Sequence, residues 1–420
     1  MQAQARQNVI SIKNIEEAAV RLNGTVAKTP CLRNYNLSEK YDCNIFLKRE
    51  DLQVVRSFKI RGAYNKMAKL SKIERNHVVV CASAGNHAQG VAFACADLKI
   101  KGKIFMPSTT PQQKVKKVQH FGKQWIEIIL EGDTFDDAFV LAEKEQKQSS
   151  AIFVHPFNDL DVIAGQGTVA LEMLGELHEE LDYLFVAVGG GGLISGVSSY
   201  FKAKSPNTRI ISVEATGAPA LHNSLKAGER IFLDSIDGFA DGVAVKEVGD
   251  ITFRVCKEFV DDSILVDEGA ICSAILSLYN DEAIVAEPAG AVSIAALEQY
   301  KDKIKGKNVG VIICGGNNDV SRTEEIRERA LLWEGKKHYF IIKFPQRAGA
   351  LKEFLNVLGP DDDIAHFEYT KKNNRQSGPA LVGIELKNKE DFEALMQRMD
   401  QNNINYEHIN DRPILFEWIV

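Results

Sequence analysis

Lys59 is the residue of this chain that stands out for its chemistry. It lies in Ser57-Phe58-Lys59-Ile60-Arg61-Gly62, a cation between two apolar neighbours. Apolar surroundings disfavour the charged form of an amine and lower its pKa. A neutral amine attacks carbonyl carbons and forms Schiff bases. The spacing therefore indicates a candidate reactive lysine, although most lysines are only solvated surface charges. Phe58 either packs in the core or forms one wall of a slot for a flat cofactor.

Four consecutive glycines, Gly189–Gly192, follow the apolar run Tyr183–Val188. This pattern predicts a strand that ends in a turn whose backbone N–H groups converge on a phosphate. A G-x-G-x-x-G frame has Ile194 or Ser195 where its last glycine belongs, and no Gly-Lys-Ser/Thr follows. A nicotinamide-dependent oxidoreductase and a P-loop are therefore excluded. A reactive lysine and a phosphate site are the two features needed to hold pyridoxal phosphate, which becomes the first hypothesis.

Two further apolar runs end in small polar residues. After Val78–Cys81, the segment Ala82–Gly90 predicts a turn that opens a helix. The N–H groups of such a turn bind anions and would suit a substrate carboxylate, but Ser83 and Asn86 can also simply cap the helix. After Val309–Ile313, Cys314 either faces the edge of a cofactor ring or is a buried small hydrophobe.

From about residue 12 to 325, apolar runs alternate with amphipathic stretches, a rhythm typical of parallel sheets with crossover helices. We therefore expect an α/β catalytic domain over residues 1–325, built from two lobes, with its ligand at the carboxyl ends of the strands. The expected strands are Val78–Cys81, Lys103–Pro107, Trp125–Leu130, Ile152–His155, Leu184–Val188, Arg209–Val213 and Val309–Cys314. The expected helices are Asn86–Ala96, Asp136–Gln146, Ala164–Leu174 and Asp281–Tyr300.

The pattern changes after residue 325. A mostly charged stretch predicts a helical connector over residues 326–337. Residues 338–420 then follow the order β-α-β-β-α-β, the ferredoxin-like α+β motif. A symmetric unit of this kind more often stands as a separate domain than as another catalytic lobe.

Composition limits the class of protein. The 420 residues are 45% hydrophobic and 26% charged with a net charge of −6, which predicts a soluble globular protein with no electrostatic footprint for nucleic acid. Lys114–Lys117 is interpreted as a solvated helix face. Seven scattered cysteines, no signal-peptide core and no long apolar stretch predict a cytoplasmic protein without a membrane span.

With these segments in place, the chain resembles the fold type II pyridoxal-phosphate enzymes of the threonine/serine dehydratase group, whose fold is that of the tryptophan synthase β subunit. The resemblance covers nearly the whole chain. It rests on Leu47–Gln53, Ser57–Gly62, Ala84–Ala88, Gly189–Leu193, Ala286–Ala291 and Gly315–Asn317.

The resemblance implies a role for each matching position. Lys59 would bind pyridoxal 5'-phosphate covalently and take part in catalysis, beside Phe58. Asn86 would hydrogen-bond the ring hydroxyl, and the backbone of Gly189, Gly190, Gly191, Gly192 and Leu193 would hold the phosphate. Ser83, Gly85, Asn86 and His87 would receive the substrate carboxylate. Cys314 falls where the partner of the ring nitrogen belongs; serine is usual there, and a thiol is a weaker donor.

The implied activity is that of a carbon–nitrogen lyase. L-threonine, and L-serine, would be deaminated to 2-oxobutanoate, or pyruvate, and ammonia, as the first committed step of isoleucine biosynthesis. A catabolic dehydratase or a serine racemase would share every catalytic segment. The alternative that is not an enzyme is an amino-acid sensor that keeps a cofactor pocket.

The C-terminal unit resembles a single ACT-like amino-acid sensing domain. The resemblance implies isoleucine as inhibitor and valine as its antagonist, with Phe344, Arg347, Gly349 and Leu351 as candidate allosteric residues. A purely oligomerising module is the alternative, and a homotetramer is the implied assembly. Some relatives bind a metal at the segment that matches Glu214–Ala218; the second acidic ligand is missing here, so no metal is expected.

Overall fold

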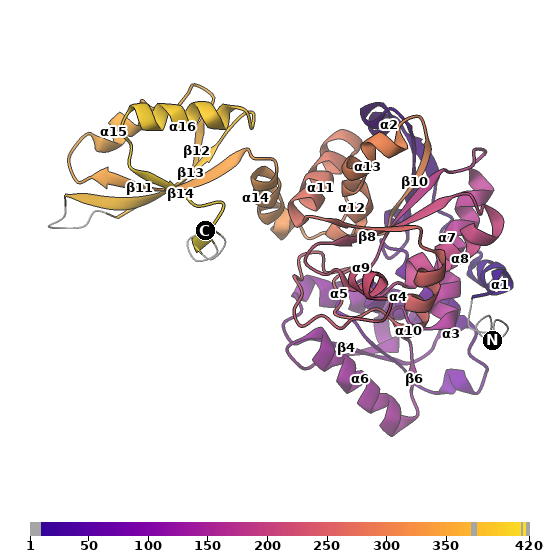
Figure 1. Cartoon of the computed structure of the whole chain (residues 1–420). Coiled ribbons are helices and arrows are strands. Elements are labelled where there is room, and N and C mark those ends of the chain that lie inside the picture. Colours follow the sequence, from indigo (N-terminus) through magenta and orange to yellow (C-terminus); the bar gives the residue numbers. More distant parts are fainter. Residues whose placement is uncertain (1–9, 371–375, 413–414, 417–420) are drawn as a thin grey trace. The chain divides into compact units, whose positions relative to one another are not determined.

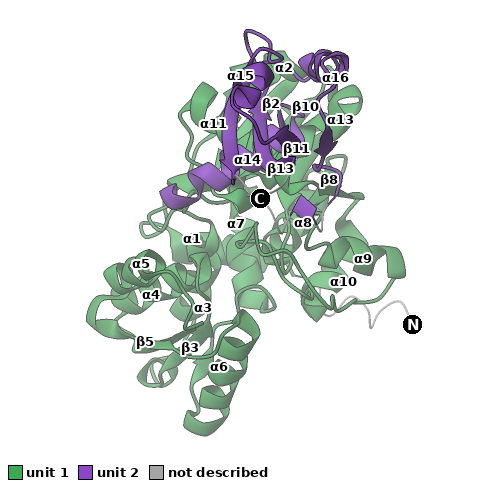
Figure 2. Cartoon of the chain, turned by 90° about the vertical axis from the view of Figure 1, so that its left-hand side faces the viewer, with its two compact units in different colours: residues 1–319 green, residues 320–420 purple. Residues whose placement is uncertain are grey.

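The computed structural model describes residues 10–370, 376–412 and 415–416 of the chain. The chain divides into two compact units, residues 1–319 and residues 320–420, shown in separate colours in Figure 2. Each unit has its own sheets and hydrophobic core.

Unit 1 contains two sheets flanked by helices (Figure 1). The larger has six strands in the order β1-β2-β10-β7-β8-β9, all parallel except the edge strand β1. Its strands are β1 (Cys31–Asn34), β2 (Asn44–Arg49), β7 (Tyr183–Ala187), β8 (Arg209–Ala215), β9 (Asp262–Val266) and β10 (Asn308–Ile313). The smaller is fully parallel, in the order β5-β4-β3-β6. Its strands are β3 (Val79–Ala82), β4 (Gly102–Met106), β5 (Ile126–Leu130) and β6 (Ile152–Phe153).

Helices connect the parallel strands, as the alternating pattern predicts. The first group is α1 (Ile12–Leu22), α2 (Tyr35–Tyr41), α3 (Lys59–Ala68), α4 (Asn86–Leu98), α5 (Gln112–Gly122), α6 (Phe135–Ser149) and α7 (Leu160–Glu176). The second group is α8 (Gly192–Lys204), α9 (Ala220–Ala227), α10 (Asp250–Phe259), α11 (Glu268–Glu282), α12 (Pro288–Ala295) and α13 (Leu297–Ile304). The predicted two-lobed α/β architecture is confirmed.

The strands that were predicted are the most apolar ones. Every residue of β3 is buried, as is every residue of β7 after Tyr183 and of β10 after Asn308, which is expected of parallel strands covered on both faces. Strands β1, β2 and β9 were not predicted. Two of these are edge strands, and β2 is polar at both ends, so none forms a continuous apolar run.

The single helix predicted over Asp281–Tyr300 is wrong. The chain instead leaves α11 at Ala283, whose φ of 53° lies in the left-handed region, and resumes as α12 at Pro288. Proline at the first helical position fits because it has no N–H to donate to the preceding turn. The interruption places Glu287 at the start of α12 instead of within a helix.

Unit 2 begins with α14 (Thr323–Trp333) and continues as an antiparallel sheet in the order β12-β13-β11-β14 with two helices. Its elements follow the predicted β-α-β-β-α-β order: β11 (Lys337–Pro345), α15 (Ala350–Leu355), β12 (Asp363–Tyr369), β13 (Ser377–Glu385), α16 (Asp391–Gln401) and β14 (Tyr406–His408). Phe340, Val382 and Leu395 are fully buried between sheet and helices. The predicted ferredoxin-like α+β fold of this unit is confirmed.

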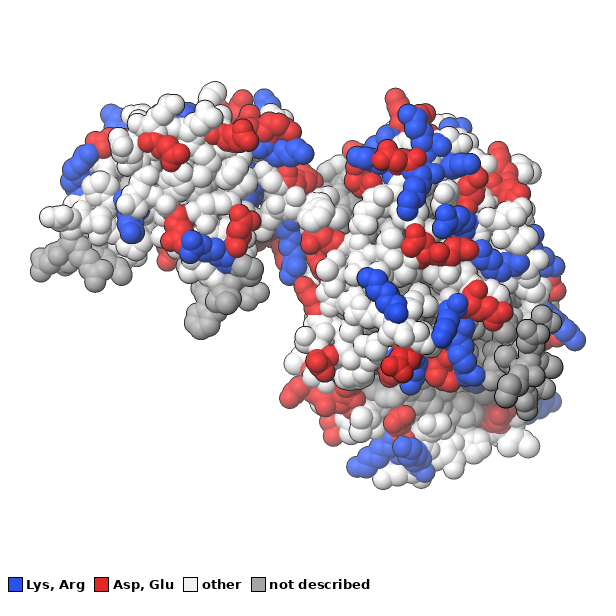
Figure 3. Space-filling view, viewed as in Figure 1, with Lys and Arg blue, Asp and Glu red and all other residues white. Residues whose placement is uncertain are grey.

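Acidic and basic side chains alternate over the face of the molecule in Figure 3, without a field of one sign. Among the described residues, none of the helices combines the length and apolar character needed to cross a bilayer.

Candidate active site

The segments singled out in the sequence meet at the carboxyl ends of the parallel strands. Lys59 is the first residue of α3 and Asn86 the first of α4, which follows β3. The glycine loop lies between β7 and α8, and Cys314 comes directly after β10. The strands therefore bring four segments, up to 255 residues apart in sequence, to one edge of the two sheets. Ligands of open α/β folds bind at such an edge.

Two adjoining cavities occupy this edge. The smaller, of about 30 Å³, is lined by Phe58, Lys59, Gly189–Leu193 and Cys314. The larger, of about 280 Å³, is lined among others by Lys59, Ser83 and Gly85–His87. Lys59 belongs to both cavities. The structure thus brings together all the cofactor and substrate residues that the sequence analysis named.

Lys59 reaches toward the backbone of the opposite wall. Its Nζ donates a hydrogen bond to the carbonyl oxygen of Pro156 at 3.3 Å. Removal from water lowers the pKa of Lys59 to about 8, while Glu287 acts in the opposite direction. At pH 8 a large fraction of this amine is therefore neutral and nucleophilic.

The glycine loop presents its backbone to the smaller cavity. Among the described residues, the N–H groups of Gly189 to Leu193 have no protein acceptor. The loop is closely packed against other residues of the cavity wall: a Cβ on Gly190 would lie 2.3 Å from the ring of Phe157, and one on Gly189 would lie 2.8 Å from the carbonyl oxygen of Val243. Gly191 has a φ of 89°, which favours glycine. Unpaired N–H groups at the start of α8, next to a reactive amine, fit the phosphate of pyridoxal phosphate.

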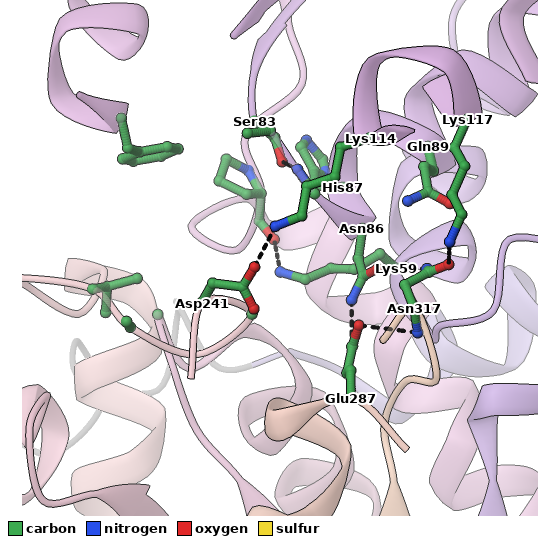
Figure 4. A pocket seen from close by; sticks show the side chains of 18 of the residues that line it. Lys59, Ser83, Asn86, His87, Gln89, Lys114, Lys117, Asp241, Glu287 and Asn317 are labelled. Carbon is green, nitrogen blue, oxygen red and sulfur yellow. Dashed lines mark hydrogen bonds and ion pairs between the residues drawn. The ribbon is translucent and has the colours of Figure 1, made fainter. Parts of the chain in front are cut away.

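Asn86 belongs to a polar network with two residues from distant segments. Its Nδ2 donates to Oε1 of Glu287 at 2.5 Å, and its Oδ1 accepts from Nδ2 of Asn317 at 2.7 Å (Figure 4). The backbone N–H of Asn317 donates to the other oxygen of Glu287 at 3.2 Å. Burial, with the nearby charge of Asp241, raises the pKa of Glu287 to about 7. This network fixes the orientation of the Asn86 side chain, whose second amide hydrogen stays available to a ligand.

The turn before α4 contains Ser83, Gly85 and His87. Oγ of Ser83 accepts the N–H of Gly85 at 3.2 Å, which closes the turn. Nε2 of His87 lies 2.8 Å from the carbonyl oxygen of Val154, and its buried Nδ1 has no partner. Burial and the charge of Lys59 lower the pKa of His87 to about 3, so the ring is neutral. Nε2 then carries the proton, and Nδ1 is left as an acceptor that faces no donor of the protein.

Cys314 is buried, and its thiol donates to the carbonyl oxygen of Ala289 at 3.1 Å. Burial raises the pKa of Cys314 well above its usual range, so the group next to the expected cofactor ring carries no charge. Phe58, the residue before α3, donates its backbone N–H to the carbonyl oxygen of Cys314 at 3.2 Å. This bond joins the start of α3 to the end of β10.

The structure adds polar and charged residues to the site that the sequence analysis did not assign. Glu287 and Asn317 lie in motifs that supported the resemblance but had received no role. Lys114 and Asp241 form an ion pair at the larger cavity (Figure 4). Lys114–Lys117 lies on α5 (Gln112–Gly122), as predicted, with Lys116 and Lys117 exposed, and Lys114 in addition pairs with a residue of the cavity wall. No local pattern distinguishes Lys114 from its neighbours, because its partner lies 127 positions away.

A buried ion network lies behind α3. The guanidinium of Arg61 donates to both oxygens of Glu50, at 2.7 Å each, and to both oxygens of Glu172, at 2.7 and 2.8 Å. Nζ of Lys48 adds a bond of 2.7 Å to Glu172. These contacts join the helix that begins with Lys59 to β2 and α7.

The four candidate allosteric residues of unit 2 line one cavity of about 390 Å³. Phe344 is at the end of β11, and Gly349 precedes α15 with a φ of 87°. Arg347 pairs with Glu353 at 2.8 and 2.6 Å. Leu351 completes this set beside the aromatic rings of Phe367 and Tyr369.

The segment Glu214–Ala218 supplies a carboxylate that caps the N-terminus of α9. The buried carboxylate of Glu214 accepts the N–H groups of Leu221 and His222, at 2.8 and 2.6 Å, in the first turn of α9. Burial raises the pKa of Glu214 to about 8. Among the described residues, no group of three or more His, Cys, Asp and Glu side chains is arranged to hold a metal ion.

Comparison with known protein families gives one match in each of the two units. Residues 22–315 match the family described as pyridoxal-phosphate dependent enzyme, and residues 328–419 match the C-terminal regulatory domain of threonine dehydratase. The chain is 56% identical over 414 residues to L-threonine dehydratase biosynthetic IlvA of Bacillus subtilis, with 98% of each chain covered. The protein of the same name from Halalkalibacterium halodurans is 55% identical over 412 residues, which is 98% of this chain and 99% of that one.

Solved structures give the same result. Threonine deaminase isoform 2 of Solanum lycopersicum, in its processed form, superposes with a TM-score of 0.72 at 40% identity, covering 77% of this chain and 95% of that chain. Maize serine racemase gives a TM-score of 0.71 at 34% identity, covering 77% and 98%. By its sequence, its fold and the residues gathered at its strand ends, this chain belongs to the family of pyridoxal-phosphate dependent enzymes.

Proposed function

We propose that this protein deaminates L-threonine to 2-oxobutanoate and ammonia, and L-serine to pyruvate and ammonia. The observation that carries the proposal is the position of Lys59, whose amine lies between a loop of unpaired N–H groups and a polar substrate-sized cavity. The relatives that are more than half identical over their full length are L-threonine dehydratases described as biosynthetic. We therefore place the reaction at the start of isoleucine biosynthesis.

The residues that would hold the cofactor line the smaller cavity, except Asn86, which lines the larger one. The N–H groups of Gly189–Leu193 suit the phosphate, Phe58 and Cys314 line the space for the ring, and Asn86 has an amide hydrogen free for the ring hydroxyl. When bound, pyridoxal phosphate supplies an aldehyde carbon that condenses with amines and a ring that withdraws electrons from the substrate's α-carbon. The neutral thiol of Cys314 leaves the ring nitrogen without an acidic partner, which favours prompt loss of the β-hydroxyl over transamination.

The substrate's carboxylate would lie in the turn of Ser83, Gly85 and His87, at the start of α4. This places the α-carbon beside Lys59, whose neutral amine takes the α-proton. The β-hydroxyl leaves as water, and a water molecule then adds at the carbon that carries nitrogen. The net reaction releases one ammonia and one 2-oxo acid for each amino acid.

A serine racemase would use the same cavity, and maize serine racemase superposes on unit 1. The regulatory unit distinguishes the two alternatives, because residues 328–419 match the regulatory domain of threonine dehydratase. A catabolic dehydratase has little reason to respond to isoleucine. A sensor with an inactive pocket would not need a lysine with a pKa of about 8 in the site.

Isoleucine is the effector that we propose for unit 2, with valine as its antagonist. The cavity beside Phe344 combines apolar walls with the guanidinium of Arg347, which is the combination that an aliphatic amino acid requires. Coupling is reciprocal: if isoleucine weakens threonine binding, threonine must weaken isoleucine binding by the same factor. Leu351→Asp is expected to raise the isoleucine concentration needed for half-maximal inhibition, with each rate expressed relative to that variant's own rate without isoleucine. Val320→Asp is the control, because Val320 is exposed and does not line the cavity.

We also propose a homotetramer in the cytoplasm. Large apolar side chains stay exposed on neighbouring elements of unit 1, among them Tyr35 on α2 and Tyr279 on α11. Asn36 of α2 donates to Glu282 of α11 at 2.8 Å, so these exposed rings belong to adjacent helices. All seven cysteines are buried and none of them forms a disulfide in the described part of the chain, which fits a reducing compartment. The mass by light scattering tests the assembly.

The first experiment measures 2-oxobutanoate release from L-threonine with and without L-isoleucine, and D-serine formation from L-serine. Release that isoleucine suppresses supports both parts of the proposal. D-serine that forms faster than pyruvate would instead establish a racemase. Lys59→Ala is expected to lose both turnover and cofactor absorbance, and a Lys59→Ala protein that still consumes threonine contradicts the mechanism.

A further inference from the structure

The larger cavity has one apolar corner. Phe135, the first residue of α6, lines it together with Ala244 and Val245 from the loop that follows Asp241. Phe135 is 41% exposed, although large aromatic residues are usually covered. The remaining side chains around the opening are mostly polar or charged, including the Lys114–Asp241 ion pair.

This corner is held in place from both sides. Asp136, next to Phe135, pairs with Lys246, next to Val245, at 3.2 Å. The loop itself is fixed because the N–H groups of Val243 and Ala244 both donate to the carbonyl oxygen of Ala240, at 2.9 and 3.0 Å. The apolar corner is therefore a built part of the cavity wall, not an accident of an unrestrained loop.

The other apolar side chains of the cavity already have a place beside the cofactor site. Phe157 packs against Gly190, where a Cβ would meet its ring at 2.3 Å, and Pro156 accepts the hydrogen bond of Lys59. A threonine whose amino group points to Lys59 and whose carboxylate lies in the turn before α4 has its side chain left to place, a β-carbon that carries a hydroxyl and a methyl group. Charged Lys114 and Asp241 cannot receive a methyl group favourably, because it would displace their hydration.

We infer that Phe135, Ala244 and Val245 receive the β-alkyl group of the substrate and set the preference of this enzyme for threonine over serine. This inference rests on the proposed function and deepens it. An apolar contact to one methyl group contributes roughly 1–3 kcal/mol to discrimination between two substrates. Serine has no group to place in this corner and gains nothing from it.

The test compares kcat/KM for L-threonine and L-serine in single variants of the holoenzyme. Val245→Thr keeps the shape of the side chain but replaces a methyl by a hydroxyl, and it is expected to lower the threonine-to-serine ratio by about tenfold. Val140→Thr is the matched control: Val140 lies on α6 outside the cavity, is 61% exposed, and its substitution should leave the ratio unchanged. Because each ratio is measured within one protein preparation, partial loss of folded enzyme cancels.

A second variant tests the same corner by gain of activity. Phe135→Ala enlarges the corner by most of a ring, so the kcat/KM for 2-amino-3-hydroxypentanoate relative to threonine is expected to rise. Unchanged ratios in both variants, with a wild-type enzyme that deaminates threonine, overturn the inference and leave the proposed function standing. A wild-type protein that deaminates neither threonine nor serine overturns both.

Discussion

The amide of Asn86 donates to the buried carboxylate of Glu287 at 2.5 Å, which joins the first residue of α4 to the residue before α12. Asn317 closes the network: its side-chain amide donates to Oδ1 of Asn86, and its backbone N–H donates to Oε2 of Glu287. The residue expected to contact the cofactor ring is thus oriented by a carboxyl group whose pKa is raised to about 7 by burial and by Asp241. The protonation of Glu287 is therefore linked to the stability of the site.

Glu287→Gln is expected to alter the pH dependence of stability. Because the folded-state pKa of Glu287 is about 7 and the ordinary value is 4.5, the folded protein binds more protons between these pH values. Wild-type stability therefore falls as pH rises from 4.5 to 7, by an amount on the order of 2 kcal/mol. The amide has no proton to lose, so the variant should gain stability relative to wild type across this window. Urea unfolding of the cofactor-free proteins at pH 5 and pH 8 measures the difference; parallel pH profiles would contradict it.

Cofactor uptake by the apo-protein should depend on the ionisation of Lys59. With a pKa of about 8, the neutral fraction of the amine rises about tenfold per pH unit below 8 and levels off above it. The rate of pyridoxal phosphate incorporation, followed by absorbance, should show this profile. Lys59→Ala should show no such absorbance change and serves as the blank. A rate that still climbs at pH 10 would mean that Lys59 titrates like a surface lysine.

Gly190→Ala is expected to weaken cofactor binding by at least about tenfold, the equivalent of one poorly placed contact to the phosphate. The added Cβ would lie 2.3 Å from the ring of Phe157, so the loop or the ring must move away from its present position. Gly175→Ala in α7 is the control, since a Cβ there meets nothing within 4 Å. Equilibrium dialysis of pyridoxal phosphate against both variants gives the affinities. Equal affinities would show that the loop tolerates displacement.

Arg61→Met should destabilise unit 1 strongly without touching either cavity. It leaves the buried carboxylate of Glu50 and that of Glu172 without their guanidinium partner, a loss of about 3–5 kcal/mol. The exposed pair of Arg254 with Asp250 provides the comparison, because breaking it should change stability by no more than about 1 kcal/mol. Chemical denaturation of Arg61→Met and Arg254→Met tests this; similar midpoints would mean that the network contributes little.

Much of the fold was predictable because each catalytic segment is a local unit. A buried strand followed by small residues and a helix is visible in the sequence at Ala82–Gly90 and at Gly189–Leu193, and the structure places both at strand ends. The order of elements in unit 2 was predictable for the same reason. The missed strands β1, β2 and β9 lack a continuous apolar run, and the break before Pro288 was hidden by apolar residues on both sides.

The candidate backbone turns and the candidate reactive amine could be found from local sequence, since the conformational freedom of the glycine loop and the apolar neighbours of Lys59 are properties of adjacent residues. The partners of these groups depend on how the chain folds. Glu287 reaches Asn86 across 201 positions, and Asp241 reaches Lys114 across 127. Lys59 and Glu287 lose their water only when distant segments meet as the sheets assemble. The same is true of the apolar corner formed by Phe135 and Val245. Electrostatics and cavity shape act through space, so no local pattern in the sequence records them.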